Sequence, residues 1–311
     1  MSTPAISSAG RVCAIIVTFN RKDLLHQSVS GFRSQTRGVD KIVVVNNAST
    51  DGTSEMLARD FPDVHAINLS ENTGGAGGFY AGMKWAYQQG YEWIWVTDDD
   101  GFPAPDCLEQ MFRQRIDEDV MIPIQEDRWG QKYGFAYWNG RALGLTADVI
   151  RSNEVARRND CLFTFVGPVF ARTVIDKVGL PYPHLFIHFD DWEYALRINT
   201  AGGFRSICVP QAIMYHTASN AQREVRFLNR RKMRDGMPPW RTYYATRNLL
   251  FAITRTTRKP RELVHFALLQ VRSVVGDLMY ESLRWKHTRF RFKGLLDGLI
   301  GRMGKRVAPG A

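Results

Sequence analysis

The chain has 311 residues, of which 44% are hydrophobic and 12% aromatic, so it folds into a globular protein and is not a disordered chain. The net charge of +10 is uneven, because residues 222–311 hold 21 of the 41 basic residues but only 6 of the 31 acidic ones. We therefore predict a mildly acidic body, residues 1–221, followed by a basic region whose surface meets lipid headgroups or nucleic acid phosphates.

The cysteines predict the redox environment. None of the four occurs in a C-x-x-C pair, so neither a zinc site nor a disulfide framework is indicated, and a reducing cytoplasm is expected. The N-terminal segment MSTPAISSAGR lacks a charged start followed by an apolar run, so we expect no signal peptide.

Continuous apolar runs of strand length alternate with helical patterns in the first hundred residues. Such runs predict a parallel sheet covered by helices on both faces, and therefore an α/β fold; they are residues 12–19, 42–45, 66–69 and 93–97. A polar loop follows each run, and in open α/β sheets these loops lie together at the carboxyl ends of the strands, where ligands bind.

Two of these loops have distinctive residues. The loop 71–78 has four glycines in five positions and opens a helix, which fits either a structural turn or a phosphate contact. The run ending at residue 97 continues as Asp98, Asp99, Asp100 and Gly101. Like charges crowded at one strand end favour the binding of a hard divalent cation, which would take its other ligands from water and phosphates. The alternative is that these residues form an acidic turn exposed to solvent.

The second half of the body is less regular. We interpret residues 125–160 as loops and short strands over the site, residues 162–171 as a bent or edge strand broken at Gly167, and residues 207–210 and 212–216 as a last strand pair. Between them, Asp190 and Asp191 precede a helix that either could cap.

The basic region contains an amphipathic helix. Its apolar positions follow the i, i+3, i+4, i+7 spacing: Val264, Ala267, Leu268, Val271, Val274, Val275 and Leu278. Residues 263–285 are too polar to span a bilayer, and residues 284–306 interleave basic with aromatic side chains. Packing of the apolar face on the body and attachment to a membrane surface both remain open.

Six motifs occur in an order that resembles inverting family 2 glycosyltransferases of the GT-A fold. They are TFNR (Thr18–Arg21), VVVNNASTDGT (Val43–Thr53), ENTGGAGGF (Glu71–Phe79), TDDDG (Thr97–Gly101), LFIHFDDWEYALR (Leu185–Arg197) and MYHTAS (Met214–Ser219). The third and fifth are most similar to bacterial galactofuranosyltransferases, followed by rhamnosyltransferases of cell-wall and O-antigen assembly.

The resemblance implies a fold and a site. The fold would be a Rossmann-like, mostly parallel sheet with helices on both faces over residues 1–221, followed by a basic α-helical region over residues 222–311. Mn²⁺ or Mg²⁺ would bind Asp98, Asp100 and His216, and Asp191 would be the catalytic base. Donor-binding residues would be Thr18, Asn20, Arg21, Asn47, Asn72, Gly75, Asp98 and Asp99. Acceptor-binding residues would be Asp190, Trp192 and Glu193, with Asp190 an alternative base.

One departure concerns the donor base. The family usually has Asp at the end of the second strand, whereas Asn46 and Asn47 stand there in this chain. Asn47 can still hydrogen-bond uracil or thymine, but the contact is neutral, so the identity of the donor base stays open.

The resemblance favours transfer of galactofuranose from UDP-galactofuranose to a polyprenyl-diphosphate-linked saccharide on the cytoplasmic membrane face. Its alternative is rhamnose transfer from dTDP-rhamnose. A nucleotidyltransferase would need more basic residues near the acidic motif than Arg21 and Lys22. A nucleic-acid or membrane-surface binding module would explain the basic tail but not the acidic motifs, so no nucleic acid partner is expected.

Overall fold

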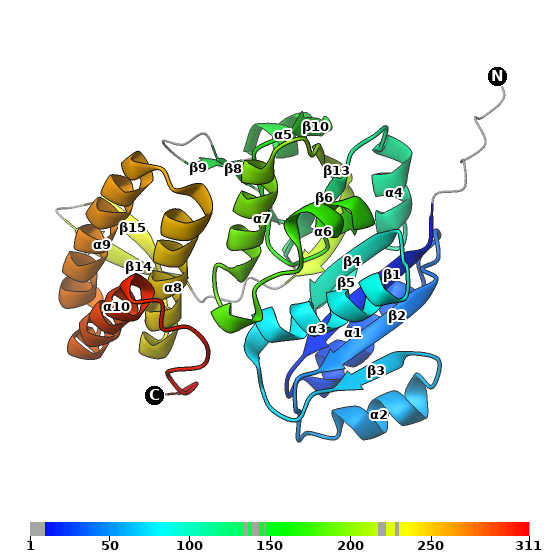
Figure 1. The fold of residues 1–311 in the computed structure, drawn as a ribbon, viewed down its shortest axis with the longest axis horizontal. Coiled ribbons are helices and arrows are strands. Elements are labelled where there is room, and N and C mark those ends of the chain that lie inside the picture. The colour runs from blue at the N-terminus through cyan, green and yellow to red at the C-terminus, as the bar shows by residue number, and fades with distance from the viewer. Residues whose placement is uncertain are drawn as a thin grey trace.

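A mixed β-sheet forms the centre of the molecule (Figure 1). The computed structural model describes residues 10–127, 129–133, 136–138, 143–145, 147–216, 222–227 and 230–310. The ten-stranded sheet has the order β10-β13-β6-β12-β4-β1-β2-β3, with β5 beside β13 and β7 beside β6. Its strands are β1 (Val12–Thr18), β2 (Lys41–Asn46), β3 (His65–Asn68), β4 (Trp93–Asp98), β5 (Gly101–Pro103), β6 (Val120–Glu126), β7 (Lys132–Tyr133), β10 (Ala156–Arg158), β12 (Val169–Ala171) and β13 (Ser206–His216).

Helices and a small second sheet complete the body. A three-stranded sheet contains β8 (Ala136–Trp138), β9 (Leu143–Leu145) and β11 (Cys161–Leu162). The helices are α1 (Lys22–Arg33), α2 (Thr53–Asp60), α3 (Gly74–Gln88), α4 (Cys107–Gln114), α5 (Ala147–Ser152), α6 (Arg172–Val178), the 3₁₀ turn η1 (Pro183–Leu185) and α7 (Asp190–Ala201). This is the predicted α/β class, with a mostly parallel half-sheet from β4 to β3.

The parallel half of the sheet confirms the predicted apolar runs. All seven residues of β1 are buried, as expected for a strand with both faces covered. Helix α3 packs so closely on this strand that side chains would not fit at two of its glycines. A Cβ atom at Gly82 would come within 2.3 Å of Ile15 Cγ2, and one at Gly78 within 2.4 Å of Val17 Cγ1. The glycine-rich segment is therefore largely helical, and its glycines allow α3 to pack against β1.

Two strand predictions need correction. The segment 162–171 is broken at Gly167, which has φ +88°, as predicted, but it does not form an edge strand: β12 lies between β4 and β6, antiparallel to both. The two runs near residue 210 form one strand, β13, rather than a pair. Its register against β6 shifts between Val209 and Ile213, and this irregularity accommodates Pro210 inside a sheet.

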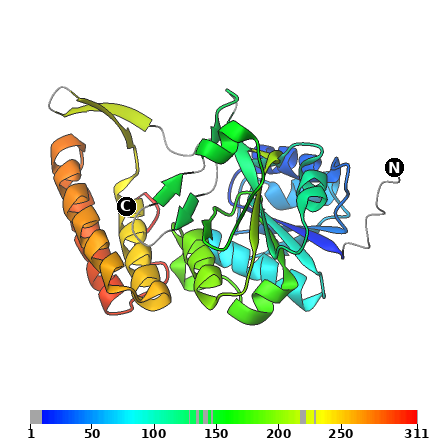
Figure 2. The same ribbon diagram turned by 90° about the horizontal axis from the view of Figure 1, so that it is seen from above.

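The C-terminal region begins with strands, contrary to the purely helical prediction. An antiparallel hairpin of β14 (Gln222–Phe227) and β15 (Arg230–Asp235) precedes the helices. These are α8 (Pro239–Phe251), the π-helical turn η2 (Ala252–Thr257), α9 (Pro260–Tyr280) and α10 (Arg284–Leu299). Figure 2 shows α8 between the body and an outer layer of α9 and α10. The proposed boundary at residue 221 lies outside the described residues.

Candidate active site

Strand pairing places the acidic motif beside the residues predicted to act with it. Parallel strands β1 and β4 pair Val17 with Asp98, so Thr18 lies next to the start of the motif. Antiparallel strands β5 and β13 pair Gly101 with His216. The ends of three strands that are distant in sequence therefore meet at Asp98–Gly101.

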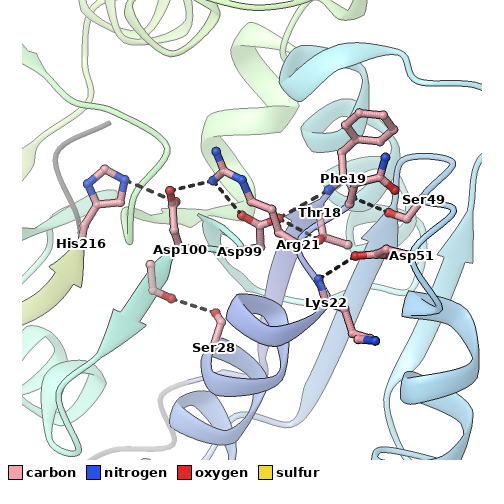
Figure 3. Close-up of polar contacts among 12 residues, drawn as sticks. Thr18, Phe19, Arg21, Lys22, Ser28, Ser49, Asp51, Asp99, Asp100 and His216 are labelled. Atoms are coloured by element: carbon pink, nitrogen blue, oxygen red, sulfur yellow. Dashed lines mark hydrogen bonds and ion pairs between the residues drawn. The ribbon is translucent and has the colours of Figure 1, made fainter. Parts of the chain in front are cut away.

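Arg21 and His216 hold the acidic motif from two sides (Figure 3). Arg21 Nη1 donates to Asp100 Oδ2 at 2.8 Å and to Asp99 Oδ1 at 3.3 Å. His216 Nε2 lies 3.4 Å from Asp100 Oδ1. Burial would raise the pKa of Asp100, but His216 and Arg21 outweigh it and hold that pKa below its usual value.

Asp99 is the most buried aspartate of the motif. It is buried, and its Oδ2 accepts a 2.7 Å hydrogen bond from Thr18 Oγ1. Burial is the main reason that the pKa of Asp99 rises to about 6. Thr18 and Asp99 therefore join β1 to the acidic motif, and this arrangement favours a structural role over the donor contact expected of each.

Asp98 carries the least favourable negative charge of the motif. Burial, followed by the charges of Asp100, Asp99 and Asp190, raises its pKa well above the usual value. Carboxylate oxygens and an imidazole are ligands that suit Mn²⁺ or Mg²⁺, so Asp98, Asp100 and His216 fit a divalent cation in type and charge. Among the described residues, however, no three acidic, His or Cys side chains are already arranged around one metal position.

A second carboxylate pair opens α7. Asp190 and Asp191 are the first two residues of this helix, whose positive N-terminal end favours acidic side chains, and neither is its N-cap. Asp190 is only 8% exposed, whereas Asp191 is half-buried and accepts a 2.7 Å hydrogen bond from Trp192 N. Burial and then the charge of Asp190 raise the pKa of Asp191. The charge of Asp190 also contributes to the raised pKa of Asp98, so the two carboxylate clusters lie close enough to interact electrostatically.

The segment leading to these aspartates has a strained backbone. Phe186, His188 and Phe189 have φ values of 68°, 65° and 59°, a region that side chains other than glycine rarely adopt. Helix α3 supports the segment, because Ala76 N donates to Phe186 O at 3.1 Å. A Cβ atom at Gly74 would come within 2.0 Å of the same oxygen, so the glycine motif allows this approach.

Helix α8 holds the segment from the other side through residues that the sequence analysis missed. Asn248 Nδ2 donates to the carbonyl oxygens of Leu185 at 2.9 Å, Ile187 at 2.9 Å and His188 at 2.7 Å. The neighbouring Arg247 is fully buried, and its Nη2 donates to Leu185 O at 2.8 Å. The only sequence signal is a polar pair among the aromatic and aliphatic residues of α8.

We predict that Asn248→Ala lowers kcat about tenfold or more and destabilises the fold by ~1–3 kcal/mol, because the carbonyl groups of Ile187 and His188 lose a donor, Leu185 O keeps only its bonds from Arg247 and Ile187 N, and the aspartates lose their support. The KM for the expected nucleotide-sugar donor should change little. The measurements are steady-state kinetics and thermal unfolding. Asn199→Ala, which removes a 2.9 Å bond to Cys161 O elsewhere, is the control. Normal kcat in a destabilised Asn248→Ala protein would leave Asn248 with a structural role only.

The amide of Asn47 makes its hydrogen bonds within the protein. Asn47 is buried, its Nδ2 donates to Gly74 O at 2.9 Å, and its Oδ1 accepts from Thr73 N at 2.8 Å. Asn47 therefore joins the loop after β2 to the start of α3, and its contact with a donor base stays a prediction. A buried Asn suits this role because it can donate and accept at once.

The other expected donor residues lie on the loops after β1 and β3 and at the start of α3. Asn20 is exposed, and its Oδ1 accepts from Thr50 N at 2.7 Å, which connects the loops after β1 and β2. Asn72 is half-buried and accepts from Gly74 N at 2.8 Å. Gly75 is half-buried in the first turn of α3, where a Cβ atom would meet only Phe79 at 3.9 Å.

Trp192 and Glu193, the two expected acceptor residues that follow Asp190 and Asp191, differ in their surroundings. Trp192 is half-buried and packs edge-on against Phe189, with 5.2 Å between ring centroids. Glu193 is fully buried; it forms an ion pair with Arg197, one helical turn later, at 3.0 Å and accepts from Thr256 Oγ1 at 2.9 Å. Glu193 thus bonds within the protein and joins α7 to η2, and its contact with the acceptor stays a prediction.

Comparison with known proteins identifies the family. Residues 13–158 match the model of Glycosyl transferase family 2. Undecaprenyl-phosphate mannosyltransferase of Micrococcus luteus is 30% identical over 166 residues, which cover 49% of this chain and 68% of that protein. The chain belongs to glycosyltransferase family 2. This family 2 glycosyltransferase is also 29% identical to galactofuranosyltransferase GlfT1 of Mycolicibacterium smegmatis over 61% of this chain and 66% of that protein.

Further similarities extend over more of this glycosyltransferase. The dTDP-rhamnosyl transferase RfbF of Shigella flexneri is 25% identical over 94% of this chain and 97% of its own length. Among solved structures, the mannosyltransferase PcManGT of Pyrobaculum calidifontis, in complex with GDP-Man and Mn²⁺, has a TM-score of 0.57 at 17% identity and covers 96% of this chain and 90% of its own. That similarity shows that the glycosyltransferase has a GT-A-like fold.

Proposed function

We propose that this glycosyltransferase is metal-dependent and inverts the configuration of the sugar that it transfers. The observation that supports the proposal is the proximity of two carboxylate clusters, Asp98–Asp100 with His216 and Asp190 with Asp191: the charge of Asp190 is one of the causes that raise the pKa of Asp98. The cluster of Asp98, Asp100 and His216 suits a cation beside a diphosphate. The pair Asp190 and Asp191 suits proton removal from a hydroxyl group.

The proposed reaction needs one base. Asp191 takes the proton of an acceptor hydroxyl group while the hydroxyl oxygen attacks the anomeric carbon, and the bond from that carbon to the nucleoside diphosphate breaks with its electron pair on the leaving oxygen. Asp190, less exposed than Asp191, orients the acceptor hydroxyl. A cation held by Asp98, Asp100 and His216 would supply charge that stabilises the leaving diphosphate.

We propose galactofuranose from UDP-galactofuranose as the transferred sugar, supported by the similarity to two mycobacterial GlfT1 proteins. The alternative is rhamnose from dTDP-rhamnose, supported by the RfbF similarity, which spans nearly the whole chain. A polyprenyl-linked saccharide is the proposed acceptor, supported by the name of the Micrococcus relative. The enzyme would then act at the cytoplasmic membrane face in cell-surface polysaccharide synthesis.

A donor screen tests this function. We expect nucleotide release from UDP-galactofuranose in the presence of Mn²⁺ or Mg²⁺, and a product whose anomeric configuration is opposite to that of the donor. dTDP-rhamnose and UDP-galactopyranose serve as comparison donors. A product that keeps the donor configuration would refute the mechanism with one base, and preference for dTDP-rhamnose would select the alternative sugar.

A further inference from the structure

The outer helices α9 and α10 are apolar on the side that faces away from the protein. Of the 17 large apolar side chains that are exposed among the described residues, 13 lie between residues 263 and 300. On α9 they include Val264, Leu268, Val271 and Val275, whose spacing places them on one face. The apolar stripe predicted from the sequence is therefore largely exposed and does not pack on the body.

A second stripe continues this surface on α10. Trp285 is 71% exposed and Phe292 is 59% exposed, and Leu296 and Leu299 follow at helical spacing. Helices α9 and α10 lie side by side in both views (Figures 1 and 2). We call the exposed apolar residues of the two helices the outer apolar face.

The inward sides of the same helices are mostly polar, although Phe266 of α9 packs in a small apolar cluster with Leu250 and Ile253. Arg291 of α10 donates to Asp277 Oδ2 of α9 at 2.9 Å and to Gln270 Oε1 at 3.0 Å. Tyr243 of α8 donates to Asp297 Oδ2 at 2.7 Å. A helix of a water-soluble protein usually buries its apolar side, so this reversed arrangement indicates that the outward side meets an apolar environment.

Charge identifies that environment. All four acidic residues between positions 260 and 300 are buried or half-buried: Glu262, Asp277, Glu281 and Asp297. The exposed charged residues of the same segment are basic: Arg261, Arg272, Arg284, Lys286, Arg289 and Lys293. A surface that combines apolar side chains with only positive charge complements an anionic lipid bilayer, with tryptophan at the level of the headgroups.

We propose that the outer apolar face lies on an anionic bilayer, with its apolar side chains inserted and its basic side chains at the headgroups. No helix among the described residues is long and apolar enough to cross a membrane, so attachment by these helices would be interfacial. This role depends on the proposed membrane location of the enzyme and assigns the attachment to α9 and α10. A cavity of about 280 Å³ lined by Thr242, Leu269, Ser273 and Phe189 extends from these helices to the residue before Asp190.

Vesicle binding tests the inference without catalysis. The full chain is sedimented with vesicles of phosphatidylcholine, with or without phosphatidylglycerol. We expect binding to anionic vesicles that weakens with salt and falls about tenfold or more in Leu268→Glu/Val271→Glu, because charge replaces inserted apolar groups. These residues are 60% and 63% exposed, so the double variant should still fold. Ile116→Glu, at a 74% exposed site on the body, is the matched control.

Three results would overturn the inference. They are no binding of the unaltered protein to anionic vesicles, equal binding by Leu268→Glu/Val271→Glu, or an unaltered dimer that the double variant converts to monomers without any vesicle binding. The last result would assign the outer apolar face to a second copy of the chain. Nucleotide-sugar hydrolysis in solution is measured in parallel, because it reports on the proposed catalysis independently of the bilayer.

Discussion

Asp191→Asn is expected to lower turnover about 10²–10⁴-fold, the usual contribution of a positioned general base. The amide has nearly the same shape as the carboxylate and can still accept the hydrogen bond from Trp192 N. Donor and metal binding, measured by calorimetry with UDP and Mn²⁺, should therefore remain close to those of the unaltered enzyme. The loss should appear in kcat.

Two further variants sharpen this test. Asp190→Asn should reduce turnover less if Asp190 only orients the acceptor, and Asp176→Asn, whose carboxylate contacts Tyr87 Oη outside the site, should leave turnover unchanged. Near-normal turnover by Asp191→Asn together with collapse in Asp190→Asn would transfer the role of base to Asp190.

The pH dependence should follow the raised pKa of Asp191. A general base must be ionised, so kcat/KM should fall as the pH decreases through that pKa, which burial and then Asp190 place above the ordinary range of aspartate. For stability the sign is reversed. A carboxyl group whose pKa is raised by folding favours the folded state at low pH, and its contribution is lost as the pH rises. Because an amide does not titrate, the residual kcat/KM of Asp191→Asn should not show this fall at low pH.

Asp100→Ala is expected to weaken metal-supported nucleotide binding about 10²-fold or more, and removal of divalent ions with EDTA should abolish turnover of the unaltered enzyme. The physical reason is the crowding of carboxylates: Asp98, Asp99 and Asp100 repel one another in a buried setting, and a cation relieves that repulsion. Mn²⁺ should accordingly raise the thermal unfolding temperature of the unaltered enzyme.

The metal prediction has its own control. Asp117→Asn alters an exposed carboxylate that pairs with Arg205, so it should bind UDP and Mn²⁺ normally. Full turnover in EDTA would show that the acidic motif works without a metal ion, whereas equal stabilisation of the unaltered enzyme and Asp100→Ala by Mn²⁺ would show that Asp100 does not hold the ion. Arg21, which already contacts Asp99 and Asp100, would then be the cation beside the diphosphate.

The sequence alone was sufficient to predict the parallel strands and the acidic strand end. Strands β1, β2 and β4 are continuous apolar runs because both of their faces are buried, and such runs are visible without any partner. Parallel strands also end at one edge, so the polar residues after them were expected to meet, as Thr18 and Asp99 do. The order of the family motifs added the assignment of Asp98, Asp191 and His216, which remains a prediction.

Only the tertiary structure decided which partners the polar side chains bond and whether the apolar stripes are covered. Asn47 and Glu193 point into the protein because their partners, Gly74 and Thr256, lie 27 and 63 positions away. Asn248 donates a hydrogen bond to His188 O, which lies 60 positions earlier in the segment that precedes Asp190 and Asp191. Periodicity specifies which residues share a side of a helix, but it does not specify what covers that side. The apolar stripe of α9 was therefore predicted correctly, whereas its exposure became visible only when its polar side was found paired with α10.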